Sequence, residues 1–168
     1  MALSEARAWP SVYDAGVPRW ELRGQAISFG LWLAITGIAA YLKPNPVGHG
    51  THQYLGLPPC PSVLMFDRPC PGCGLTTSWT ALVHGDFAFA FHAHPLGPIL
   101  YGIFTAVALL GGYGFLTGQR LRTYTDKVTR LTGIDAAAFV IFGVARFALM
   151  PHFAAKYERA LFEASKQP

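Results

Sequence analysis

The sequence has little charge. Only 13% of its 168 residues are Asp, Glu, Lys or Arg, and 52% are apolar, whereas a soluble domain carries about 25% charged residues. A water-soluble surface of this size needs more charge than the chain supplies, so we expect lipid to surround much of the protein. The net charge of +4 comes from basic residues beside apolar runs. That arrangement fits anionic lipid headgroups and argues against nucleic-acid binding.

Other patterns are missing as well. The 13 prolines and 18 glycines form no low-complexity tract, and the chain has no internal repeat. A βαβ pattern is absent, which excludes a thioredoxin fold. With only three cysteines, the chain has no second CxxC pair for a four-cysteine zinc site. No two histidines have the H-x-x-x-H spacing of a helical metal pair.

Two long apolar stretches are present. Residues 24–42 and residues 96–116 each lack a formal charge. At a rise of about 1.5 Å per residue, each stretch comes close to the 30 Å of a bilayer's hydrocarbon core. We interpret residues 24–42 as a retained transmembrane helix. A signal peptide fits less well, because the preceding polar stretch is long and no small-x-small cleavage site follows.

A third stretch, residues 131–155, is a weaker candidate. It contains Asp135 and Arg146, and Pro151 interrupts it. A charge at the centre of a bilayer costs about 2.5–3.5 kcal/mol on insertion scales. We expect this stretch to span, with Arg146 in contact with a partner. Glycines of the second span are expected to pack closely against another helix; they are Gly111, Gly112 and Gly114.

Between the first two spans, the sequence predicts a loop and then short helices. Residues 43–73 form a Cys/Pro loop, because proline removes backbone donors and restricts the residue before it. Residues 74–94 are predicted to form short helices that are re-entrant or interfacial, because a lone strand with open edges is not viable in lipid. Asp86, which follows Gly85, is expected to cap the second of these helices.

The expected fold class is therefore all-α: an integral membrane protein with two or three transmembrane helices and a short re-entrant or interfacial segment after the CPGCG loop. Residues 1–23 are a cytosolic tail, residues 24–155 the membrane domain and residues 156–168 a polar C-terminal tail. Residues 1–23 and 120–130 together carry seven Lys and Arg, against two in the Cys/Pro loop. The positive-inside rule then places the N-terminus in the cytosol and the Cys/Pro loop outside.

The cysteine motif and the residues after it resemble the DUF2752 family of small bacterial membrane proteins. CPGCGLT is followed by a Gly-Asp pair and then by His-Pro. The family usually has a basic residue after its GLT, and Thr77 stands there instead. The resemblance implies a multi-pass protein of the bacterial inner membrane, with no activity attached. The matching residues are Cys70, Pro71, Cys73, Gly74, Leu75, Thr76, Gly85, Asp86, His94 and Pro95.

Three interpretations of the cysteines remain open. In the first, Cys70 and Cys73 form a knuckle that binds zinc with Cys60 and a histidine, since structural zinc needs four ligands. In the second, they carry out thiol–disulfide exchange, because a helix N-terminus favours a thiolate, with Cys60 as the resolving thiol. In the third, they pack as small apolar residues in a tight turn or form a structural disulfide. The histidine is taken as His94, with His52, His84 and His92 as alternatives.

The function that we expect is non-enzymatic. The protein is interpreted as a small membrane subunit or scaffold that presents its Cys/Pro loop at the membrane boundary. Its partners would be the lipid bilayer and other membrane proteins or further copies of itself. The alternative is a membrane thiol–disulfide oxidoreductase or a metal-binding protein that uses the CPGC motif. Zinc is the favoured metal, and a haem or chlorophyll held by a histidine is less favoured; no catalytic residue is assigned.

Overall fold

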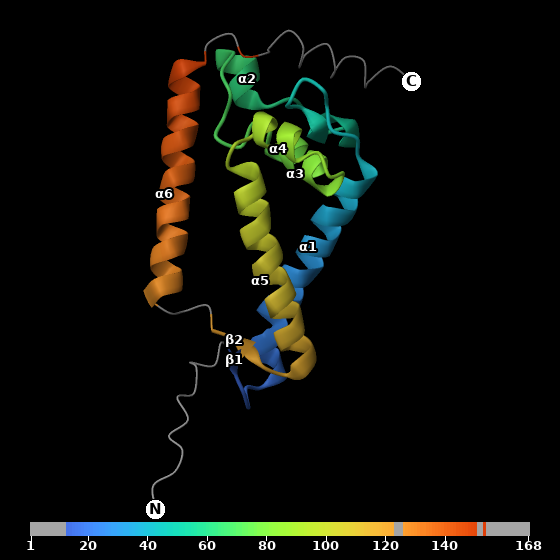
Figure 1. Ribbon diagram of the computed structural model, residues 1–168, viewed down its shortest axis with the longest axis vertical. Helices are drawn as coiled ribbons and strands as arrows, with labels where there is room; N and C mark the ends of the chain where they lie inside the picture. Colours follow the sequence, from blue (N-terminus) through green and yellow to red (C-terminus); the bar gives the residue numbers. More distant parts are fainter. Residues whose placement is uncertain (1–12, 123–125, 151–152, 154–168) are drawn as a thin grey trace, which may run out of the picture.

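The computed structural model describes residues 13–122, 126–150 and 153 (Figure 1). Over these residues the protein is mostly helical, and its three long helices are α1 (Arg23–Tyr41), α5 (Gly97–Thr117) and α6 (Asp126–Leu149). All three are long and apolar enough to cross a membrane. Large apolar side chains on each of them are exposed, such as Leu31, Leu116 and Ile141, as lipid-facing side chains are. The all-α membrane fold predicted from the sequence is confirmed.

Short elements fill the two ends of the molecule. They are β1 (Tyr13–Asp14), η1 (Arg19–Leu22), η2 (Thr51–Leu55), α2 (Pro61–Phe66), α3 (Leu75–Val83), α4 (Phe87–Ala93) and β2 (Arg120–Leu121). We call residues 43–94, which include η2 and α2 to α4, the cap. In Figure 1, α1 and α5 meet at the lower end and diverge upward, and the cap lies at their upper end. Helix α3 packs against both α1 and α5 there.

Glycines of α5 allow a close approach to α1. A Cβ atom added at Gly112 would lie 2.8 Å from the Phe29 ring, and one added at Gly111 would lie 3.5 Å from the side chain of Gln25. Small residues let transmembrane helices pack closely in this way. The helix that these glycines were expected to meet is therefore α1 of the same chain.

Two hydrogen bonds join α1 to α5 nearer the cap. Trp32 Nε1 donates to Thr105 Oγ1 at 3.0 Å, and the hydroxyls of Thr36 and Tyr101 lie 2.9 Å apart. A polar group at this depth finds no water, so each pair removes the cost of an unsatisfied donor. Such interhelical bonds contribute about 0.6 kcal/mol each on average in a membrane protein.

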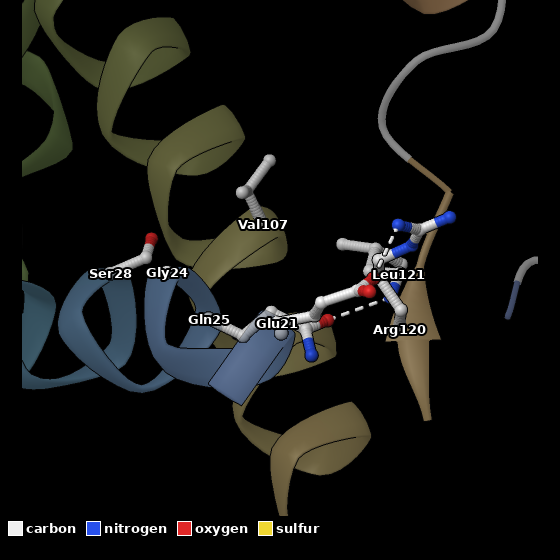
Figure 2. A pocket seen from close by; sticks show the side chains of 8 residues that line it. Glu21, Gly24, Gln25, Ser28, Val107, Arg120 and Leu121 are labelled. Carbon is white, nitrogen blue, oxygen red and sulfur yellow. Dashed lines mark hydrogen bonds and ion pairs between the residues drawn. The ribbon is translucent and has the colours of Figure 1, made fainter. Parts of the chain in front are cut away.

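The end opposite the cap is tied together by charge and by a short strand pair. Strand β1 pairs antiparallel with β2, so that Asp14 lies opposite Arg120. Arg120 also contacts Glu21 at 2.8 Å, and Gln25 bonds the backbone of Leu121 at 2.7 Å (Figure 2). The sequence predicted no strand here. The predicted tail 1–23 is held from Tyr13 onward, and residues 1–12 lie outside the described residues.

Two further elements differ from the prediction. The predicted loop 43–73 contains the short helices η2 and α2. The third long helix starts at Asp126 and ends at Leu149, whereas the sequence predicted 131–155. Its end falls just before Pro151, and the residue preceding a proline is disfavoured in a helix. The rest of that predicted stretch, apart from Met150 and Phe153, and the tail 156–168 lie outside the described residues.

A methyl group added at Gly112 is expected to weaken the contact between α1 and α5. The new side chain would press on the Phe29 ring, and overpacking of this kind costs about 1–3 kcal/mol. Gly112→Ala should therefore lower the midpoint of thermal unfolding of the full chain in detergent. Gly102→Ala in the same helix is the matched control, because nothing lies within 4 Å of its added Cβ. Equal midpoints for the two variants would contradict the contact.

Candidate metal centre

Three cysteine sulfur atoms converge in the cap. The Sγ atoms of Cys60, Cys70 and Cys73 all lie within 4.8 Å of one another. Cys60 precedes α2, and the other two belong to the turn that leads into α3. Cys73 is buried, the other two are half-buried, and none is in a disulfide. We call these three residues the cysteine cluster.

Backbone hydrogen bonds fix the conformation of the two segments that carry the cysteines. The amides of Val63 and Leu64 donate to the carbonyl of Cys60 at 3.0 and 3.1 Å, which anchors Cys60 to the first turn of α2. Pro61 suits that first turn, because its missing N–H has no partner to lose there. The amide of Cys73 donates to the carbonyl of Cys70 at 3.0 Å and closes the CPGC turn. Both thiols of the turn therefore lie on one side of a rigid loop.

Gly74 lets the turn approach the rest of the cap. Its φ is +87°, in the left-handed region that favours glycine. A Cβ atom added there would lie 2.4 Å from the carbonyl oxygen of Ala93 and 2.9 Å from that of Gly48. Both the backbone conformation and the space thus require glycine.

His94 holds the turn from the other side. The residue is fully buried, and its Nε2 lies 2.9 Å from the carbonyl oxygen of Pro71. A carbonyl only accepts, so Nε2 carries the proton, and burial lowers the pKa of this imidazole. His94 was the predicted fourth metal ligand. Its Nε2 donates to the turn, and His94 is not in the group of ligand atoms within 4.8 Å of one another, so its role as a metal ligand stays a prediction.

The C-terminal end of α6 packs against the CPGC turn. Arg146 Nη1 donates to the carbonyl oxygen of Cys73 at 2.8 Å. Arg68 Nη1 donates to the carbonyls of Phe147 and Ala148 at 2.6 and 2.9 Å; such C-terminal carbonyls lack partners within their own helix. Arg146 therefore has an intramolecular acceptor, and its contact with a partner chain stays a prediction.

A glycine and two aromatic rings complete this contact. A Cβ atom added at Gly143 would lie 2.3 Å from the Pro71 ring, so α6 touches the turn directly. The rings of Phe139 and Phe142 lie 6.0 and 5.3 Å from the imidazole of His94. Sequence reasoning missed both Arg68 and Gly143, because neither belongs to the cysteine motif.

The three thiols share protons unequally. Hydrogen bonds from Cys70 and Cys73 lower the pKa of the Cys60 thiol. The thiols of Cys70 and Cys73 have raised pKa values, because each hydrogen-bonds to Cys60 and both are partly buried. The Cys60 thiol is thus the one whose deprotonation the other two favour. A metal cation that replaces the thiol protons would be bound by three thiolates.

The other motif residues shape the chain around the cluster. Asp86 Oδ1 accepts a hydrogen bond from the Phe89 amide at 2.9 Å and caps α4. The carbonyl of Thr76 accepts from the hydroxyl of Thr80 at 2.8 Å. Pro95 lies in the turn between α4 and α5, which a bond from the amide of Gly97 to the carbonyl of His94 closes at 2.8 Å.

The cysteine cluster lines a cavity of about 240 Å³. His52 lines the same cavity, and its Nε2 lies 3.2 Å from the carbonyl oxygen of Pro58. The other two histidines that were considered as ligands do not line it. His84 Nδ1 lies 2.8 Å from the Thr80 carbonyl, and His92 stacks on Phe89. The remaining lining residues are Gly50, Pro58, Pro59, Pro61, Gly72, Gly74, Thr76 and Thr77.

Comparison with known proteins supports the resemblance found in the sequence. Residues 60–108 match the family model described as "Protein of unknown function (DUF2752)". The matched segment begins at the first residue of the cysteine cluster and ends within α5. No curated protein and no solved structure matches the chain. The resemblance is confirmed over this segment, which carries the whole cluster.

Replacement of Gly74 is expected to disrupt the turn. Gly74→Ala would strain a left-handed residue by about 1–3 kcal/mol and would place its methyl group against the Ala93 carbonyl. We expect a lower unfolding midpoint and faster alkylation of the Cys73 thiol. Gly72→Ala is the matched control, because Gly72 has no positive φ and nothing within 4 Å of an added Cβ. If the two variants behaved alike, the tight approach at Gly74 would not exist.

Proposed function

We propose that the protein is a small membrane-bound metal-binding protein whose cysteine cluster holds one thiophilic metal ion. The observation that carries this proposal is the mutual distance of the three sulfur atoms, all within 4.8 Å. Thiolates select soft or borderline ions such as Zn²⁺ and Cu⁺. Bonds from thiolate to zinc are about 2.3 Å long, so three sulfurs this close together can surround a single ion.

The arrangement supports metal binding better than the alternatives. A structural disulfide would use two of the sulfurs and leave the third without a role. Cysteines that merely fill space need not point at one another from two separate segments. A thiol–disulfide oxidoreductase would use the same residues, and it is the second candidate, because Cys60 stands beside the CPGC pair as a resolving thiol would.

The position of the cluster adds to the proposal. The cap lies at the ends of α1 and α5, away from the ion-paired end. Basic residues next to the spans at that other end include Arg19, Arg23 and Arg120, and the positive-inside rule places such residues in the cytosol. We therefore propose that the cap faces the outside of a bacterial inner membrane. Presentation of the cap to a membrane partner stays a prediction from the sequence.

The metal hypothesis predicts loss of binding in each single cysteine variant. Full-length protein in detergent, incubated with zinc and desalted, should retain about one zinc per chain by elemental analysis. Cys60→Ser, Cys70→Ser and Cys73→Ser should each lose it, because two thiolates do not hold zinc without further ligands. His84→Ala, whose imidazole bonds the Thr80 carbonyl of the preceding helix turn, is the control that should keep the metal.

Thiol reactivity separates the two candidate functions. Bound zinc should protect all three thiols from alkylation, and a chelator should restore their reactivity. A reversible disulfide with no retained metal would support the oxidoreductase and contradict the metal hypothesis. Three thiols that react equally fast with and without zinc would also contradict the metal hypothesis.

The orientation is tested by reporter fusions. Alkaline phosphatase is active only outside the inner membrane, so a fusion after Asn45 should be active and one after Arg122 inactive. A green fluorescent protein at the same two sites should give the opposite result, because it fluoresces poorly when exported through the general secretion pathway. The reverse pattern at both sites would place the cap in the cytosol.

A further inference from the structure

We infer that His52 is the fourth ligand of this site, which makes it a four-coordinate Cys3His zinc centre. The inference rests on the proposed function and adds to it the remaining ligand and the class of ion. Of the histidines that the structure describes, His52 is the one that lines the cavity with the cysteine cluster. The predicted ligand His94 does not line this cavity.

The imidazole of His52 already has the hydrogen bond of a metal ligand. Its Nε2 lies 3.2 Å from the carbonyl oxygen of Pro58. Because a carbonyl only accepts, Nε2 carries the proton and the lone pair lies on Nδ1. Histidines that bind metals generally donate their second N–H to a carbonyl or a carboxylate, which fixes the tautomer. Nδ1 of His52 is therefore the nitrogen available to the ion.

The segment that carries His52 can move toward the sulfurs. His52 lies outside the group of atoms that are mutually within 4.8 Å, so ligation needs η2 to shift toward the sulfurs. Glycines in the left-handed conformation flank this short helix, Gly50 with φ +81° and Gly56 with φ +74°. Glycine adopts many backbone conformations at low cost, so these two positions can absorb the shift.

The charge of the surroundings favours a divalent ion. Three thiolates and a neutral imidazole around Zn²⁺ carry a net charge of −1, whereas three thiolates around Cu⁺ carry −2. The guanidinium of Arg146 donates to the Cys73 carbonyl at 2.8 Å and places one positive charge beside the cluster. A partly buried charge is stabilised when it is paired, and one arginine offsets the charge of the zinc complex but not that of the copper complex.

Cobalt is the probe that reports on the fourth ligand. Co²⁺ takes the tetrahedral sites of zinc, and its visible d–d bands depend on the number and type of ligands. Its near-ultraviolet charge-transfer band reports thiolate ligands separately. Titration of the full-length protein in detergent micelles should give both sets of bands, with the charge-transfer band absent in Cys73→Ser.

The test compares His52→Ala with His84→Ala. His52→Ala should weaken Co²⁺ binding about 10-fold or more and shift the d–d bands while keeping the charge-transfer band. His84→Ala should match the wild-type protein. His52→Gln, which keeps a donor for the Pro58 carbonyl, should show the same loss, because the missing group is the imidazole ligand. His52→Cys should restore tight binding with bands typical of four thiolates.

The outcomes distinguish the inference from the proposal beneath it. If His52→Ala and His52→Gln keep the wild-type affinity and d–d bands, His52 is not a ligand and the inference is wrong, while the three-thiolate site stands. If the wild-type protein shows no charge-transfer band that depends on the cysteines, the proposed function itself fails. Equal thermal unfolding midpoints of the metal-free variants establish that a loss of binding is not a loss of fold.

Discussion

Two carbonyl oxygens of the CPGC turn, those of Pro71 and Cys73, accept hydrogen bonds from side chains that lie outside the turn. Proline has no backbone N–H, and a buried carbonyl without a partner costs free energy. His94 supplies one donor, to Pro71, and Arg146 supplies another, to Cys73. These donors come from the residue after α4 and from α6, so the turn is held by segments far away in the sequence. These two bonds hold the turn that carries Cys70 and Cys73, and with it two of the three sulfurs of the proposed metal site.

The long helices are held in two different ways. Helices α1 and α5 hold each other through glycine contacts and two hydrogen bonds along their length. Helix α6 is joined to the cap at its last turns, where Arg68 donates to its carbonyls and Arg146 donates to the Cys73 carbonyl.

Much of the fold followed from the sequence, because span length, proline positions and helix caps are local signals. The apolar runs, the short helices after the motif and Asp86 as the N-cap residue of α4 are of this kind. The convergence of Cys60 with the CPGC pair depends on the path of the intervening loop, which no spacing rule gives. The choice between His94 and His52 as a ligand was open for the same reason, since it depends on which imidazole faces the sulfurs. Likewise, the glycines of α5 indicated a close helix contact but not that α1 would fill it.

The ion pairs at the opposite end have a consequence for the biogenesis of the protein. Asp14 and Arg120 are separated by 106 positions in the chain, so they cannot pair until α5 has been synthesised and threaded. Until then Asp14 and Glu21 lack Arg120 and Arg122, the partners that they have in the folded protein. After insertion the same arginines are neutralised by Asp14 and Glu21. These ion pairs can therefore close this end of α1 and α5 only after both helices have been made.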